Sequence, residues 1–193
     1  IFILSFFGFD SLKNHIPKKD VIPYEIASPL FSDYAEKMRF IRVPYGSKIL
    51  LDDENNFIYP ENTYLIKTFY YYSDIRDQHS KKHIIETRIL KNTSEGWLSF
   101  PYVWNENQTD AKLNLAGAII SASWTHFDGN PIDILYSFPN MNQCKNCHIN
   151  GKDISPIGPT AAQLNRKYDM LSNQISQLEF YAKKGLLKNL PDH

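Results

Sequence analysis

The chain has 193 residues, of which 42% are apolar and 14% aromatic, which is enough to build the core of one large domain or two small ones. Its 21 basic and 21 acidic residues cancel to a formal net charge of zero. That balance argues against non-specific binding of nucleic acid or of an anionic membrane by the whole chain.

The N-terminal segment, residues 1–37, is expected to be irregular. Pro17, Pro23 and Pro29 interrupt it, and each proline biases the residue before it toward an extended conformation. The apolar residues 1–9 are fewer than the ~20 that a membrane-spanning helix needs, and no basic segment precedes them. We therefore interpret residues 1–37 as the start of a mature, exported domain whose leader has been removed.

The middle of the chain, about residues 38–138, is expected to be a β-rich antiparallel body. Residues 64–72 and 83–91 are rich in β-branched and aromatic side chains and are joined by a polar segment, which predicts a hairpin. Glu86 and Arg88 in this hairpin lie two residues apart, so they share one face of a strand and are expected to pair.

A second hairpin and a helical C-terminal region complete the predicted elements. Residues 118–124 and 132–138 flank an Asp-Gly-Asn-Pro sequence that is typical of a turn. Within 139–193, Thr160 can cap one helix and a second helix is expected to stop near Gly185. The predicted fold class is therefore α+β, with residues 1–193 packed as one unit.

The run Cys144-Lys145-Asn146-Cys147-His148 reads C-x-x-C-H and contains the only two cysteines of the chain. This is the attachment sequence of a c-type haem. Its two thiols form thioether bonds to the vinyl groups of the porphyrin, and the histidine binds iron as the proximal axial ligand. We therefore predict one haem c, held by Cys144, Cys147 and His148, in the C-terminal region.

Three other interpretations of the cysteine pair are open but less favoured. A structural zinc site needs about four nitrogen or sulfur ligands, and the other histidines show no finger-like spacing. A thioredoxin-like dithiol needs a strand before the motif and a helix after it, whereas the turn-like residues 137–143 precede it and Gly151 follows. A plain disulfide or two inert thiols is the third alternative.

Longer strings support the haem interpretation along nearly the whole chain. They are SPLFSDYA at 28–35, KTFY at 67–70, ETRIL at 86–90, YVWNENQTD at 102–110, PNMNQCKNCH at 139–148, PIGP at 156–159 and LNR at 164–166. Together they resemble a family of exported bacterial diheme c-type cytochromes. The resemblance implies covalent haem at Cys144 and Cys147 with His148 as axial ligand. Diheme members carry a second C-x-x-C-H, whereas these 193 residues contain one. The second haem domain would then be a separate subunit, would have been lost, or would lie outside these residues, and a second haem-bearing subunit is a candidate partner.

The second axial ligand of the iron decides between electron transfer and catalysis. The candidate side chains are His15, His79, His83, His126, His193, Met38, Met141 and Met170. Met141 lies too close to Cys144 to reach the far side of the ring. Met170 and His126 are preferred, although a core methionine and a solvent-facing histidine are the simpler interpretations.

The sequence therefore predicts a periplasmic or otherwise exported cytochrome subunit, because haem is attached to such motifs on the outer side of the energy-coupling membrane. It would pass single electrons to or from a partner cytochrome or a larger redox complex, and electron transfer is favoured over enzymatic activity. No nucleic-acid partner and no transmembrane segment are expected, so membrane association would come through a partner or a lost anchor. A peroxidase-like haem enzyme with an open distal site and a structural subunit of a redox assembly are the alternatives.

Overall fold

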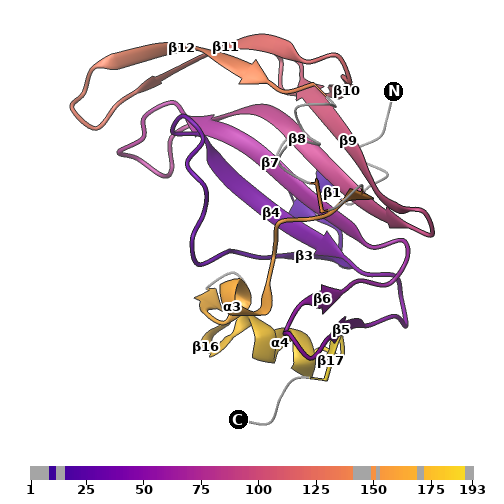
Figure 1. Cartoon of the computed structure of the whole chain (residues 1–193). Coiled ribbons are helices and arrows are strands. Elements are labelled where there is room, and N and C mark those ends of the chain that lie inside the picture. Colours follow the sequence, from indigo (N-terminus) through magenta and orange to yellow (C-terminus); the bar gives the residue numbers. More distant parts are fainter. Residues whose placement is uncertain (1–8, 12–15, 141–148, 151–152, 169–171, 190–193) are drawn as a thin grey trace.

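The structure is a computed structural model that describes residues 9–11, 16–140, 149–150, 153–168 and 172–189. It is mostly antiparallel β-sheet (Figure 1), and its centre is a six-stranded sheet in the order β10-β9-β8-β7-β4-β3. The strands of this sheet are β3 (Val21–Pro23), β4 (Glu36–Arg42), β7 (Tyr64–Tyr72), β8 (Lys82–Thr93), β9 (Gly96–Trp104) and β10 (Ala111–Leu113).

Smaller elements surround this sheet. The paired strands are β1 (Phe9–Ser11) with β2 (Ile16–Pro17), β11 (Ala118–Thr125) with β12 (Pro131–Phe138), β13 (Ile149–Asn150) with β14 (Asp153–Ile154), and β15 (Lys167–Tyr168) with β16 (Ser172–Ser176). A three-stranded sheet contains β5 (Ile49–Leu51), β6 (Phe57–Ile58) and β17 (Leu187–Lys188), and the described helices are α3 (Ala161–Leu164) and α4 (Gln177–Lys183).

The two faces of the central sheet differ in character. Phe40, Ile66 and Ile89 are cross-strand partners and belong to a buried cluster on one face. Because successive side chains in a strand alternate between faces, their neighbours Arg39, Lys67 and Arg88 lie on the other face, which we call the pocket face.

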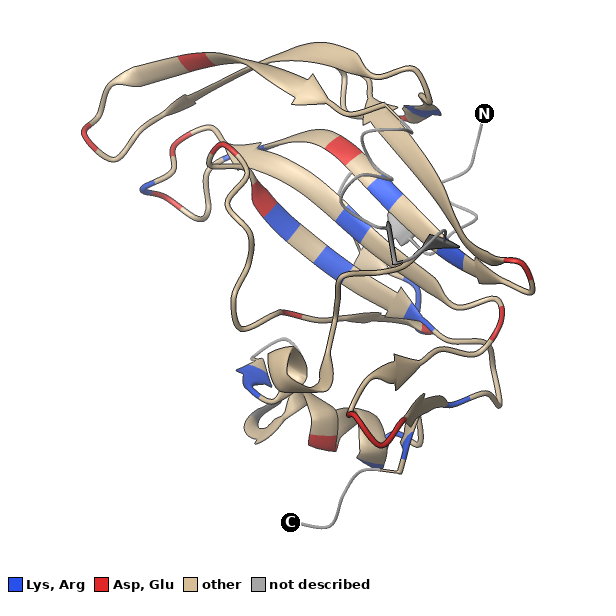
Figure 2. Ribbon diagram, viewed as in Figure 1, with Lys and Arg blue, Asp and Glu red and all other residues tan. Residues whose placement is uncertain are grey.

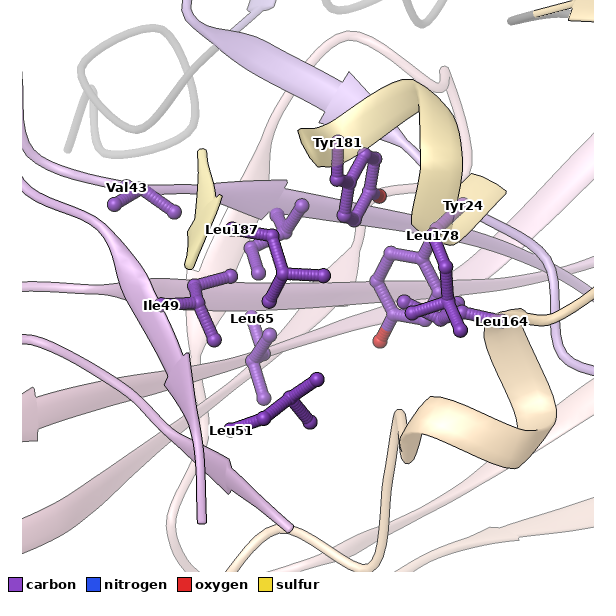
Figure 3. Packing of buried hydrophobic residues seen from close by; sticks show 10 residues of the cluster. Tyr24, Val43, Ile49, Leu51, Leu65, Leu164, Leu178, Tyr181 and Leu187 are labelled. Carbon is purple, nitrogen blue, oxygen red and sulfur yellow. The ribbon is translucent and has the colours of Figure 1, made fainter. Parts of the chain in front are cut away.

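Two separate groups of elements cover the two ends of the pocket face (Figure 1). The hairpin cover is β11 and β12, whose buried rings, including Trp124 and Phe138, pack with Phe69 and Tyr71 of β7. The C-terminal cover is β5, β6, β17, α3 and α4. Figure 3 shows its side chains meeting Leu65 of the sheet in one apolar cluster.

A β-bulge in β8 changes which side chains of this strand point to the pocket face. Phe69 pairs with Glu86, whereas the next residue of β7, Tyr70, pairs with Ile84, so Ile85 is the extra residue of β8. Ile85 packs with the hairpin cover, and Glu86 lies beside it on the same face. A bulge of this kind locally re-aims side chains.

The predicted α+β class is wrong. The described part of residues 139–193 is not the expected helical haem-binding region, because it contains strands β13 to β17 and only two short helices, of four and seven residues. Thr160 does cap α3, but the helix ends when Asn165 adopts ψ 58°. Residues after it then pair as β15 and β16, so backbone pairing replaces the expected longer helix.

The N-terminal segment 1–37 is also more regular than predicted. Its described residues include β1, β2 and β3, and Val21 to Pro23 join the edge of the central sheet beside β4. β4 itself starts at Glu36, within this segment. Pro17 in β2 and Pro23 in β3 are accommodated because edge strands do not need every backbone donor. In the described part of the chain, no helix has the length and apolar character required to cross a bilayer.

Candidate functional site

The predicted haem-binding residues Cys144, Cys147 and His148 lie outside the described residues. Four of the candidate sixth ligands also lie outside them: Met141, Met170, His15 and His193. The description resumes at Ile149 in β13, whose partner strand β14 contacts β9 of the central sheet. The candidate site is therefore built from the described residues of the pocket face.

A pocket of about 400 Å³ opens on this face, between the two covers. Its walls are mainly apolar and come from the sheet, from residues 24–32 and from the turn before α3. Its lining residues include Leu30, Phe31, Arg39, Lys67, Arg88 and Tyr136, the last of them from the hairpin cover. Leu30 and Phe31 are 66% and 71% exposed, so the mouth of the pocket presents apolar side chains to solvent.

Three cations form the floor of the pocket. Arg39 on β4 is the register partner of Lys67 on β7, and Lys67 is the register partner of Arg88 on β8. We call these three residues the cation row. Figure 2 shows basic positions running across the central strands of the sheet. Like charges directly opposite one another in a sheet are destabilising, so the cation row needs a compensating partner.

Glu86 compensates one end of the cation row. Its carboxylate is fully buried, and it accepts hydrogen bonds from Arg88 Nε at 3.0 Å and Arg88 Nη2 at 2.5 Å. The hydroxyl of Tyr136, on β12, donates to the same carboxylate at 2.6 Å. Burial, and then the charge of Glu86, raise the pKa of Tyr136 well above its ordinary value. The predicted pairing of Glu86 with Arg88 is confirmed.

The other two cations have no such partner among the described residues. Arg39 is only 7% exposed, and its Nη2 atom has no hydrogen-bond partner. Lys67 lies over the ring of Phe69, with Nζ 4.7 Å from the ring centroid. Burial, followed by the nearby charge of Arg39, lowers the pKa of Lys67 to about 7. An unpartnered buried polar atom costs about 1–3 kcal/mol.

The candidate sixth ligands that are described do not come together. Met38 packs on the opposite face of the sheet, in the cluster around Phe40. His79 is exposed, and the pKa of His83 is lowered, first by burial and then by the charge of Lys81.

His126 lies in a second pocket, of about 600 Å³, beside the hairpin cover. The ring centroid of Tyr34 is 4.9 Å from that of His126, and Trp124 Nε1 donates to His126 Nδ1 at 3.5 Å. Phe31 lines both pockets. His126 is therefore a half-buried member of an aromatic cluster next to the pocket face.

Sequence reasoning missed Arg39 and Lys67. A signal was present for Lys67, because it is the only charged residue in the nine-residue apolar and aromatic strand β7. A lysine or arginine that is flanked by buried neighbours is almost never fully buried without a partner. Across the described residues, no group of three or more histidine, cysteine or acidic side chains is placed to hold a metal ion.

Comparisons of the chain with protein-family models, with curated proteins and with solved structures found no match. The resemblance to diheme c-type cytochromes therefore rests on the sequence strings alone and stays a prediction.

Proposed function

We propose that this protein is an exported c-type cytochrome subunit that carries one haem and transfers single electrons. The observation that carries the proposal is the C-x-x-C-H run at residues 144–148, which holds the only cysteines of the chain. Cys144 and Cys147 would hold the porphyrin through thioether bonds, and His148 would ligate the iron. When bound, the haem supplies a one-electron couple between ferric and ferrous iron.

The chemistry of the pocket face supports the proposal. A haem is a large apolar plane with carboxylates at one edge, and the pocket combines apolar walls with a basic floor. Arg39, with its buried and unpartnered nitrogen, is the kind of residue that an anionic edge would satisfy. The role of the apolar side chains would be to exclude water, since burial of the haem is one of the protein's means of setting its reduction potential.

The proposed partners follow from the proposed chemistry. A protein that only carries electrons needs a donor and an acceptor, so we expect a redox partner, for which a second haem-bearing subunit is the leading candidate. The location would be the periplasm or another exported compartment, since the attachment of haem to such motifs takes place there.

The test is the haem content of the purified chain after expression with the haem-attachment machinery. We expect a c-type pyridine haemochrome with one haem per chain that resists extraction by acidic acetone. The double variant Cys144→Ser/Cys147→Ser should lose all covalent haem. The matched control Lys145→Ala/Asn146→Ala changes only the spacer and should keep it.

Two outcomes would reject the proposal. The first is a wild-type chain without haem, and the second is a serine variant that keeps haem through the extraction. A low-spin spectrum supports electron transfer. High-spin bands with rapid uptake of cyanide would move the assignment to a peroxidase-like enzyme.

A further inference from the structure

The cation row has more positive charge than the described residues around it neutralise. Glu86 pairs with Arg88, but among the described residues neither Arg39 nor Lys67 forms an ion pair. The nearest alternatives are engaged elsewhere or face water, because Glu25 pairs with Arg166 at 3.3 Å and Glu36 is exposed. A buried guanidinium without a partner is costly, so the pocket is suited to an anion that enters from outside the described part of the chain.

The walls of the pocket narrow the class of that anion. Leu65, Phe69 and Leu90 of the sheet and Ile157 opposite them line it together with the cations. A small hydrated anion such as phosphate would leave these apolar side chains in contact with water. A carboxylate carried on an apolar body would cover them and would place its charge on the floor.

We infer that Arg39 and Lys67 form a binding site for the carboxylate of an apolar ligand. That carboxylate has two possible sources. One is a propionate of the haem, a source that rests on the proposed function, and the other is a free organic acid. The site itself does not depend on haem attachment, because both cations belong to the described sheet.

The electrostatics of Lys67 support this assignment. Its pKa is lowered to about 7 by burial and by its cationic neighbours Arg39, Arg88 and Lys37, with Glu86 acting in the opposite direction. A bound carboxylate adds a negative charge beside Lys67, which favours the charged ammonium form. The ligand would therefore restore the ordinary ionisation of Lys67 and would also satisfy Arg39.

The first arm of the test uses the full chain without haem, as the Cys144→Ser/Cys147→Ser variant, and octanoate as the probe. Calorimetric titration should detect octanoate but not octan-1-ol, since the alcohol lacks the charge. Arg39→Gln in this background should weaken octanoate binding by at least about tenfold, the loss expected for one charge-assisted hydrogen bond. The matched control is Arg42→Gln, because Arg42 lies on the same strand but pairs with Asp20 at the surface.

The second arm uses the haem-loaded chain and separates the two sources. If a propionate occupies the site, octanoate should no longer bind, and Arg39→Gln should lower the reduction potential while Arg42→Gln leaves it unchanged. This direction follows because a cation near the haem disfavours the more positive ferric state. If the ligand is a free acid, octanoate should still bind the loaded chain with the same sensitivity to Arg39→Gln, and the potential should not move.

The inference is overturned if octanoate fails to bind the haem-free chain and Arg39→Gln leaves the reduction potential of the loaded chain unchanged. A wild-type chain without haem would reject the proposed cytochrome, and the octanoate titration would still decide the site. Arg39→Lys, which keeps the charge, and Lys67→Met give independent variants, each checked for folding by circular dichroism, so a misfolded Arg39→Gln protein does not prevent a decision.

Discussion

The ammonium group of Lys67 lies between two arginine neighbours on a half-covered sheet face, and this position changes its ionisation. Burial is the main cause of its lowered pKa, and the charges of Arg39, Arg88 and Lys37 act in the same direction. A folded-state pKa of about 7 lies well below the ordinary value of 10.5. The unfolded chain therefore binds one more proton at this residue than the native chain over the pH range between these values.

The stability of the ligand-free protein should consequently rise with pH between about pH 7 and 9.5. The slope from Lys67 is at most about 1.4 kcal/mol per pH unit, the value for one proton. Lys67→Met should remove this contribution. Urea unfolding of the haem-free wild type and variant at pH 7 and 9.5 measures it, with Lys48→Met as a control at the surface. Equal pH dependence in the wild type and Lys67→Met would contradict the prediction.

At the scale of elements, the hairpin cover is joined to the sheet by a polar contact as well as by apolar packing. Tyr136 of β12 donates to Glu86 of β8 at 2.6 Å, in surroundings that exclude water from the carboxylate. The same contact orients Glu86 toward Arg88. It therefore holds one end of the cation row in place and fixes the hairpin over the sheet.

Tyr136→Phe removes this hydrogen bond and keeps the ring. We expect the free energy of unfolding to fall by about 1–3 kcal/mol, because a buried charged acceptor loses a donor. Urea denaturation at pH 7 measures the loss. Tyr45→Phe is the control, since Tyr45 is fully exposed and its substitution should change stability little. A Tyr136→Phe protein as stable as the wild type would show that the contact contributes nothing.

Elements whose signal is local were predictable, and those that depend on distant packing were not. The two predicted hairpins are present as β7 with β8 and as β11 with β12, because alternating β-rich runs and a turn sequence specify them locally. The C-terminal helices were overestimated. Leu164 in α3 and Leu178 and Tyr181 in α4 are the apolar residues that favoured helices, and they are buried against β5 and the sheet. This tertiary packing needs only short helical turns.

On the scale of the whole molecule, the C-terminal end of the described chain returns to its first half. Leu187 of β17 pairs in parallel with Ile49 of β5, and Gln177 exchanges hydrogen bonds with the backbone of Glu25 at 2.8 and 2.9 Å. These contacts join residues more than a hundred positions apart in the sequence. No local pattern encodes such pairings, which is why neither they nor the pocket between the covers could be predicted.

Leu187→Ala should therefore destabilise the whole protein rather than only its end. Leu187 is 5% exposed and packs in the C-terminal cover, so its truncation should cost about 2–5 kcal/mol. Urea unfolding followed by tryptophan fluorescence measures this cost. Leu115→Ala, at a position that is half exposed, is the control. A small loss confined to the C-terminal residues, seen as local hydrogen exchange, would contradict the expectation.

The bulge in β8 lets two adjacent residues of one strand make contacts on the same face of the sheet. In a regular strand, adjacent residues point to opposite faces of the sheet. An apolar contact and a charged contact on the same face would therefore come from residues at least two positions apart. Here Ile85 and Glu86 are adjacent in sequence and lie on the same side. The single extra residue thus lets β8 pack against the hairpin cover with Ile85 and bind Arg88, at the end of the cation row, with Glu86.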